Sequence, residues 1–383
     1  MAERVCYRLV ARSPFHIGER GVGIEESSVV LHSDTLFSAI CLTLRELGED
    51  LEGFLACFPR IQADGKQPPV ILPAQHAPPF RLSSAFPYAG DVFFFPRPMI
   101  PPQGLDEIGD PKLGKTLKKI DFVSRPIFEA LLAGRPIAHF LVEDDAETPG
   151  GKCLRRGVLP QKGQVWVTPS EVGLLRQYLD ARTGEVRLWS EDVVPRVTVD
   201  RKTNRSQVYA AGRIRFAPGC GLFLLIDYSD ATWKPRVERA LRVLGDSGIG
   251  GERSSGHGQF LLETAEGFSM EENSPNLETA YVTLSLFWPT EAEVQAKGLA
   301  GASYGLVNRH GWMGSPDGMN LRRRAVRMIT EGSVLRRKPE GALADVKPLD
   351  PSPAENVPHA VWRYGLAMSV GCDWTGGNGG SYE

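Results

Sequence analysis

The stretch from Gly248 to Phe260 has the sequence GIGGERSSGHGQF and is the most informative part of this chain. Its thirteen residues include five glycines, together with Arg253, Ser254 and Ser255. Glycine lets the backbone adopt positive φ and lets another molecule approach the peptide groups closely. Arginine offers a planar charged group suited to phosphate, and serine hydroxyls add neutral donors. We therefore expect a loop that holds a polyanion against its main-chain N–H groups.

The order of elements around this loop separates it from mononucleotide-binding loops. It follows a helical pattern at Trp233 to Leu244 and precedes the apolar stretch Phe260 to Leu262. It lacks the Gly-Lys-Ser/Thr ending of a P-loop, and no G-x-G-x-x-G motif stands between a strand and a helix. This order favours an RNA-backbone clamp. A flexible turn joining two elements is the simpler alternative.

The remaining elements of the first part of the chain complete a β-α-β-β-α-β order. A buried strand is predicted at Gly221 to Tyr228, and two earlier strands are predicted at Val5 to Val10 and at Val92 to Phe95. Between them a helix is predicted to begin at Ser33 or Asp34, either of which is a good N-cap, and to end at Gly48. This order is typical of a ferredoxin-like fold, in which both helices cover one face of an antiparallel sheet.

We therefore expect an α+β protein with two ferredoxin-like (RRM-like) units, antiparallel sheets, a long insertion and a projecting hairpin. The first unit is predicted to span residues 1–268, with insertions at about 60–190, and to end in the glycine-rich loop 248–258. Residues 60–112 are rich in proline and are predicted to form a long surface excursion with one aromatic strand at Val92 to Phe95.

The second unit is predicted to span residues 276–383. It opens with a strand pattern at Tyr281 to Trp288 and closes with another at Arg363 to Val370. No short repeat is visible in the sequence.

A basic β-hairpin, or thumb, is predicted at about 195–215. From Pro195 to Tyr209 β-branched and polar residues alternate around a Lys-Thr-Asn turn. Between Arg196 and Arg215 six basic residues accompany one acid, Asp200. The net charge of −2 does not exclude a polyanion partner, because binding depends on the local field. Arginines on solvated faces are the alternative explanation.

Composition bounds the class of protein. The 383 residues, 42% of them hydrophobic, suffice for two domains or for one domain with large insertions. The six cysteines form no C-x-x-C pair and no zinc-like spacing with histidine. The longest apolar run, Leu222 to Ile226, is far too short to cross a bilayer, and no apolar signal core opens the chain. We expect a soluble cytoplasmic protein without membrane segment, metal or cofactor.

The candidate catalytic residues form no convincing set. His16, His32 and His257 could serve as general acid and base of a metal-free ribonuclease, but their spacing is not specific for catalysis. Asp34 could hold a metal or position a phosphate, although a role at the helix start explains it more simply. The serines of the glycine loop lack a nearby His-Asp pair. The sequence therefore predicts a protein that is not an enzyme.

Several stretches together resemble the RAMP superfamily of CRISPR proteins. Within its Cas-five-like group, they are most similar to the family that forms the fourth subunit of type III-A (Csm) effector complexes. The similar stretches run from near residue 5 to near residue 370 and comprise residues 31–39, 195–201, 248–258, 306–312, 330–334 and 364–367.

The resemblance implies a non-catalytic, CRISPR RNA-binding subunit of a hetero-oligomeric ribonucleoprotein in antiviral defence. Such subunits hold the 5′ tag of the crRNA and join the large polymerase-like subunit to the first backbone RAMP subunit. Their thumb bends the RNA between tag and guide. A contact between residues 60–112 and target RNA is left open.

Site residues follow from the same resemblance. The tag phosphates would lie against Gly250, Gly251, Arg253, Ser254 and Ser255. The thumb would present Arg196, Thr198, Arg201 and Lys202. The helix start would offer Ser33 and Thr35, and further contacts would come from His16, His257, Arg309 and Trp312.

Two alternatives stay open at this point. One is a metal-independent RAMP endoribonuclease that processes precursor crRNA through the histidines named above. The other is a scaffold subunit of another type III subtype.

Overall fold

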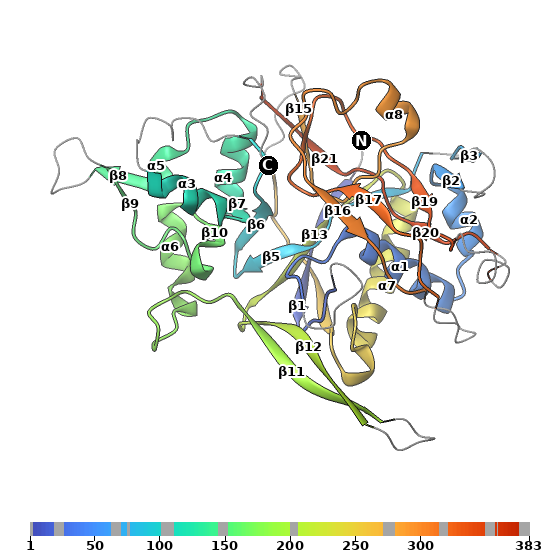
Figure 1. Ribbon diagram of the computed structural model, residues 1–383, viewed down its shortest axis with the longest axis horizontal. Coiled ribbons are helices and arrows are strands. Elements are labelled where there is room, and N and C mark those ends of the chain that lie inside the picture. The colour runs from blue at the N-terminus through green and yellow to red at the C-terminus, as the bar shows by residue number, and fades with distance from the viewer. Residues whose placement is uncertain are drawn as a thin grey trace.

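An eight-stranded sheet lies at the centre of the computed structural model of the chain (Figure 1). The structure describes residues 3–18, 27–62, 70–74, 77–100, 111–144, 152–199, 206–270, 280–313, 321–348, 357 and 359–374. The sheet has the order β10-β7-β6-β5-β13-β1-β14, and β4 also pairs with β13. Its strands are β1 (Glu3–Ala11), β4 (Phe80–Leu82), β5 (Phe86–Ala89), β6 (Val92–Pro96), β7 (Phe122–Ser124), β10 (Val165–Trp166), β13 (Cys220–Tyr228) and β14 (Phe260–Thr264).

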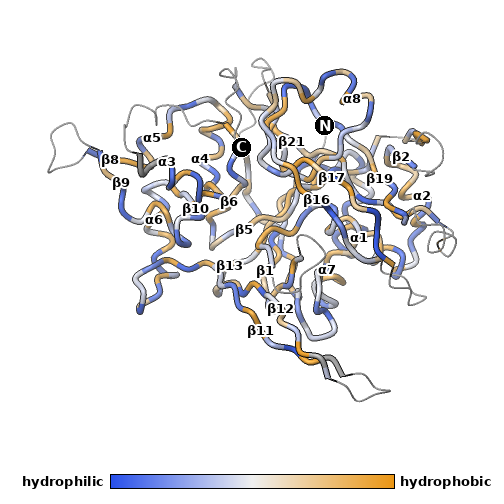
Figure 2. Tube along the Cα trace, in the orientation of Figure 1, coloured by the Kyte–Doolittle hydropathy of each residue, from blue (hydrophilic) through white to orange (hydrophobic). Residues whose placement is uncertain are grey.

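The two central strands, β1 and β13, are buried on both faces. They pair antiparallel, with Tyr7 opposite Leu224. This register puts Tyr7 and Leu224 in one hydrophobic cluster, and Cys6 and Leu225 in another on the opposite face. Because both faces are covered, β13 is a nearly continuous apolar run, and the hydrophobic segments of β5, β6 and β13 gather in the middle of the molecule (Figure 2).

The helices α1 (Ser33–Glu46) and α7 (Lys234–Ser247) cover one face of this sheet. Both match the helices predicted from periodicity, and Leu36, Ile40 and Leu44 of α1 are buried. The opposite face of the sheet carries the second hydrophobic cluster, which includes α4 (Arg125–Leu132). Within this sheet all neighbouring strands are antiparallel except β7 and β10, so the predicted α+β class with an antiparallel sheet is confirmed.

The prediction of a surface excursion at residues 60–112 is wrong for the residues that the structure describes. β4, β5 and β6 belong to the central sheet, and Phe80, Phe86 and Phe94 are fully buried. The aromatic strand predicted at Val92 to Phe95 is confirmed as β6. The prolines had suggested loops, yet Pro87 and Pro96 lie within strands.

The C-terminal part consists of small sheets rather than one large one. β15 (Ala280–Thr283) lies between β18 (Val334–Leu335) and β21 (Ser369–Cys372), and β16 (Leu306–Arg309) pairs with β17 (Val326–Ile329). A further sheet has the order β20-β19-β2-β3 and combines β19 (Leu343–Asp345) and β20 (Trp362–Arg363) with β2 (Arg60–Gln62) and β3 (Val70–Leu72). The sole helix in its described residues is α8 (Glu291–Gln295), so a second ferredoxin-like unit is not confirmed.

A two-stranded hairpin projects from the body of the molecule (Figure 1). It consists of β11 (Trp189–Val199) and β12 (Ser206–Phe216), so it is longer than the predicted span of about 195–215. The other elements are α2 (Leu51–Ala56), α3 (Pro111–Lys118), α5 (Ala138–Leu141), α6 (Pro169–Leu175), β8 (Val142–Asp144) and β9 (Lys152–Leu154). None of the helices in the described segments is both long enough and apolar enough to cross a membrane.

Candidate nucleic-acid interface

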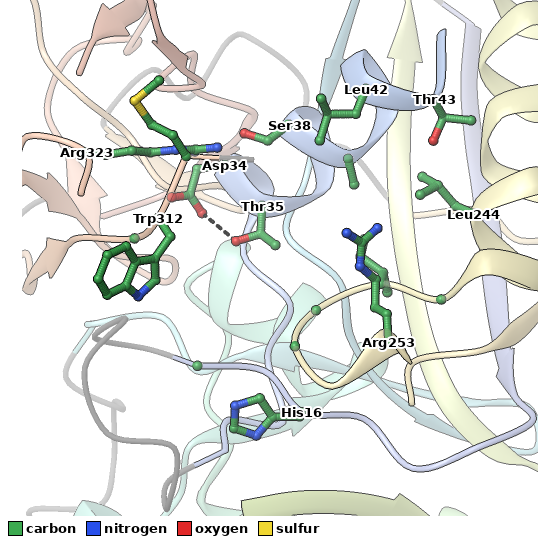
Figure 3. Close-up of a pocket in the computed structure, with 18 of the residues that line it drawn as sticks. His16, Asp34, Thr35, Ser38, Leu42, Thr43, Leu244, Arg253, Trp312 and Arg323 are labelled. Carbon is green, nitrogen blue, oxygen red and sulfur yellow. Dashed lines mark hydrogen bonds between the residues drawn. The ribbon is translucent and has the colours of Figure 1, made fainter. Parts of the chain in front are cut away.

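A cleft of about 670 Å³ brings together three parts of the chain that are far apart in the sequence (Figure 3). One wall is the glycine loop after α7, the second is the start of α1, and the third is the turn after β16. Of the residues predicted to contact RNA, the cleft is lined by His16, Thr35, Gly250, Gly251, Arg253, Arg309 and Trp312. These seven predicted residues therefore lie together in the fold, although several of them make contacts within the chain there.

The glycines of the loop are required by contacts within the chain itself. Gly248, Gly250 and Gly258 have φ of 82°, 93° and 77°. A Cβ at Gly250 would overlap the carbonyl oxygen of His16, and one at Gly258 would overlap the backbone of Ile249. The close approach that we had ascribed to a ligand is thus made first by the segment around His16.

The amides of the loop fall into two groups. The first group donates to carbonyls of the chain: Gly248 to Leu244, Ile249 to Gly258, Gly251 to His16, Ser255 and His257 to Glu252, Gly256 to Arg253, and Gly258 to Pro14. A second group finds no hydrogen-bond acceptor among the described residues: the amides of Gly250, Glu252, Arg253 and Ser254. Consecutive unpaired N–H groups of this kind form an anion-binding concavity. The loop therefore offers fewer free amide donors than predicted, because the amide of Gly251 is already bonded to His16.

The side chains at this turn are exposed. Arg253, Ser254 and Ser255 all reach solvent, and Figure 3 shows Arg253 beside the start of α1. Glu252 adopts the left-handed conformation, with φ of 56°. Its carboxylate accepts from Tyr209 of β12 at 3.3 Å and from Ser255 at 3.4 Å. Glu252 therefore ties the turn to the hairpin, and Arg253 forms no ion pair with any residue that the structure describes.

His16 joins the glycine loop to the hairpin. Its ring Nδ1 lies 2.6 Å from the carbonyl oxygen of Gly212 in β12, and its own carbonyl accepts from the amide of Gly251 at 2.9 Å. The side chain is only 8% exposed. Since Nδ1 must donate to a carbonyl, Nε2 is the ring atom left for the cleft.

The start of α1 differs from the prediction. The N-cap is His32, without a side-chain capping bond, so neither Ser33 nor Asp34 is the cap. Ser33 is fully buried; its hydroxyl accepts from the amide of Leu286 at 3.1 Å. Ser33 therefore fastens α1 to the C-terminal part and is not offered to a ligand. Thr35 lines the cleft, but its hydroxyl lies 3.3 Å from Asp34 and 3.1 Å from Arg309.

Asp34 is the centre of a buried ion-pair network. Its carboxylate accepts two hydrogen bonds of 3.0 Å from Arg309 and one from Arg363. The exposed fractions are 2% for Asp34, 4% for Arg309 and 3% for Arg363. Burial alone raises the pKa of Asp34, but the two guanidinium groups outweigh it and hold that pKa below its usual range.

This network changes the roles predicted for two residues. Arg309 was predicted to contact RNA, yet its guanidinium is directed at Asp34 and almost wholly buried. Asp34 neither caps the helix nor stands ready as a catalytic acid, because its carboxylate neutralises two arginines. Sequence reasoning missed Arg363, although a single charge in the apolar run from Val361 to Leu366 is a signal for a buried ion pair.

A second buried pair lies behind the helix start. His32 Nδ1 lies 2.8 Å from Glu331, which also accepts a hydrogen bond from Ser84. Burial alone raises the pKa of Glu331, but His32 and Ser84 outweigh it and the net pKa is lowered. Sequence reasoning gave Glu331 no role. The ring of His32 is used in holding the C-terminal part to the helix start.

The hairpin places its described arginines on one face. Arg196 lies opposite Tyr209, and Asp192 opposite Arg213, so the side chains of all four share a face. Thr198 belongs to β11, but its side chain, and the whole of Arg201 and Lys202, lie outside the described residues. The predicted role of these three residues stays a prediction.

His257 is buried rather than presented to a ligand. It is 7% exposed, and burial together with the nearby charge of Arg196 lowers its pKa below the usual value. A buried imidazole with a lowered pKa is a weak phosphate ligand, so the RNA contact at His257 stays a prediction. Trp312, in contrast, is 50% exposed, and the Arg322 guanidinium lies 4.9 Å from its ring centroid.

No group of His, Cys, Asp and Glu suited to a metal ion occurs in the part of the chain that the structure describes. The six cysteines carry no disulfide, and three of them, Cys6, Cys220 and Cys372, are buried.

Comparison with known proteins gives one consistent answer. Residues 276–372 match the family model described as the CRISPR Csm4 C-terminal domain. The Csm4 protein of Thermococcus onnurineus is 28% identical over 302 residues, covering 76% of this chain and 80% of the relative. The Csm4 protein of Mycobacterium tuberculosis is 26% identical over 336 residues, covering 86% of this chain and 88% of the relative.

Solved structures show the same fold. The Csm3–Csm4 subcomplex of the type III-A CRISPR-Cas interference complex contains a chain with a TM-score of 0.61 and 19% identity, covering 97% of this chain and 99% of that chain. The Csm1–Csm4 cassette in complex with cA4 contains a chain with a TM-score of 0.54 and 20% identity, covering 98% of this chain and 100% of that chain. The resemblance to Csm4 that the sequence motifs indicated is thereby confirmed.

Proposed function

We propose that this chain, which is similar to Csm4 over most of its length, is a non-catalytic RNA-binding subunit of a type III CRISPR effector complex. In this proposal the 5′ tag of the crRNA lies in the cleft between the glycine loop and the start of α1. The observation that carries it is the group of unpaired amides at Gly250 and Glu252 to Ser254, with the exposed Arg253 beside them. Amides and arginines bind phosphate irrespective of sequence, as a tag holder requires.

The fold supports the same proposal. The strand order β5-β13-β1-β14, with α1 and α7 on one face, fits a ferredoxin-like RAMP unit. The hairpin of β11 and β12 then acts as the thumb, with Arg196 and Arg213 facing RNA that leaves the cleft. In solved structures Csm4 is found with Csm3 and with Csm1, so we propose equivalent large and backbone subunits as partners.

The buried state of the histidines favours a holding role over cleavage. His32 contacts Glu331, and His16 contacts the carbonyl of Gly212, so each ring is engaged in a structural contact. His257 is buried with a lowered pKa. A general acid must be protonated and within reach of its substrate, which this arrangement does not favour.

The charge-reversing variant Arg253→Glu tests the proposal in the effector complex co-purified from the native host. Loss of a charge-assisted contact of about 1.5–3 kcal/mol should lower the affinity for crRNA at least tenfold at moderate salt and thereby reduce the RNA-loaded fraction of the complex. Arg156→Glu is the matched control, since Arg156 is exposed and lies outside the cleft. An unchanged yield of RNA-loaded complex from Arg253→Glu would contradict the proposal.

A cleavage assay addresses the endoribonuclease alternative. Purified protein is incubated with labelled repeat RNA and a chelator, and we expect the RNA to stay intact. Site-specific cleavage that disappears in His16→Ala would instead favour the enzyme.

A further inference from the structure

The wall of the cleft opposite the glycine loop carries a charged residue that forms no ion pair with the described part of the chain. Arg323 lines the cleft and is half-buried. It makes no ion pair and no side-chain hydrogen bond with any residue that the structure describes, and its Nε is buried without a partner. Figure 3 shows it beside Asp34, across the cleft from Arg253.

The surroundings of Arg323 make its unpaired charge energetically unfavourable. Asp34 already accepts hydrogen bonds from Arg309 and Arg363, so three guanidinium groups surround one carboxylate. Burial, with the like charge of Arg363, lowers the pKa of Arg323 to about 10, so it still carries its proton at neutral pH. A partly buried cation among other cations is favourable only when an anion joins it.

The backbone holds Arg323 in place. Its amide donates to the carbonyl of Gly311 at 2.9 Å, and the neighbouring Trp312 and Arg322 form a β-bridge. Trp312, which is 50% exposed, lines the same cleft as Arg323, and its ring lies 4.9 Å from the guanidinium of Arg322. An aromatic surface beside a cationic site is the combination that single-stranded nucleic acid uses.

We infer that Arg323, backed by Arg309 and Arg363, is a second phosphate-binding subsite that takes another phosphate of the RNA strand held by the glycine loop. The inference rests on the proposed function, since it adds an opposite wall to the same cleft. A strand that crosses the cleft contacts the amides beside Arg253 at one wall and Arg323 at the other.

Two properties separate this role from a structural one. Arg323 has no hydrogen bond or ion pair to lose among the described residues. Its burial and the repulsion from Arg363 together outweigh its attraction to Asp34, so its removal relieves an unfavourable charge. The variant Arg323→Gln should therefore fold with unchanged or increased stability while it binds RNA less well. A residue that mattered only for the fold would behave in the opposite way.

The experiment measures binding of the full-length chain to a fluorescent single-stranded RNA across a salt series. Arg323→Gln should weaken binding about tenfold and lower the slope of log K against log salt by about 0.7, the value for one phosphate contact on a single strand. Arg323→Lys should restore most of the affinity. Arg253→Gln, at the other wall, should add its own loss independently, because distant sites combine additively.

The outcomes distinguish this inference from the proposed function. Wild-type affinity and slope in Arg323→Gln, with a loss in Arg253→Gln, would overturn the second subsite and leave the proposed function standing. Wild-type binding in both variants would overturn both. Loss of stability in Arg323→Gln would assign a structural role and overturn the subsite. ATP and inorganic phosphate are added as competitors. If either of them binds through Arg323 while RNA binding does not depend on Arg323, the assignment of this subsite to an RNA strand is overturned.

Discussion

Substitution of Asp34 by asparagine tests how far the buried network holds the cleft together. The change keeps the size of the side chain but removes the charge that Arg309 and Arg363 share. Side-chain exposure is 1% for Asp34, 5% for Arg309 and 3% for Arg363, so water cannot replace the lost carboxylate. Removing one partner of a buried pair costs about 3–5 kcal/mol, and we expect a loss in that range.

Urea unfolding followed by tryptophan fluorescence measures this loss, and circular dichroism checks that the transitions coincide. Asp246→Asn is the matched control. Asp246 also pairs with an arginine, Arg12, at 3.1 Å, but the two side chains are 81% and 54% exposed. An exposed pair contributes about 1 kcal/mol or less, so the control should unfold close to the wild type.

Two results would refute the reasoning. One is a destabilisation by Asp34→Asn that is no larger than that of Asp246→Asn. The other concerns the double variant Asp34→Asn with Arg363→Met. Since an apolar replacement of a buried charge removes the unpaired cation, this variant should recover part of the lost stability. If it is less stable than the single variant, uncompensated charge is not the cause.

The remaining predictions concern the loop and the acid limit of stability. Gly258→Ala should prevent the loop from packing and lower the melting temperature markedly, because a Cβ there would overlap the backbone of Ile249. Gly256→Ala, with φ of 78° and open space around it, should cost only about 1 kcal/mol of backbone strain; equal effects in calorimetry would contradict this account. The lowered pKa of Asp34 implies stability that is complete above the usual aspartate pKa of about 3.9 and is lost as the pH falls below it. Acid unfolding of Asp34→Asn should show a weaker dependence on pH in that window, and an identical dependence would speak against the assignment.

Elements with a strong local pattern were predictable. The helical spacing of apolar residues predicted α1 and α7, and the apolar run at 221–228 predicted β13. The alternation of β-branched and polar residues around a polar turn predicted the hairpin. Five glycines in thirteen residues predicted the loop. In each case the signal lies within a single stretch of the chain.

Features that depend on distant pairing were not predictable. β4 and β5 are three and four residues long, lie among prolines and pair with β13 far along the chain. Asp34 and Arg363 are separated by 329 positions, so no local pattern connects them. The glycines of the loop stand out in the sequence, but the closest neighbour of Gly250 and Gly251 is His16, which only the folded backbone reveals.

The small sheet around β19 joins the two ends of the chain. β2, at Arg60–Gln62, pairs in parallel with β19, and the ring of Tyr364 lies 4.8 Å from that of Phe37 in the core of the first part. A chain nicked between β14 and β15 would thus stay associated as one particle until it is denatured. For the same reason residues 276–372, excised alone, would expose an open strand edge and a set of apolar side chains that belong inside another part of the molecule.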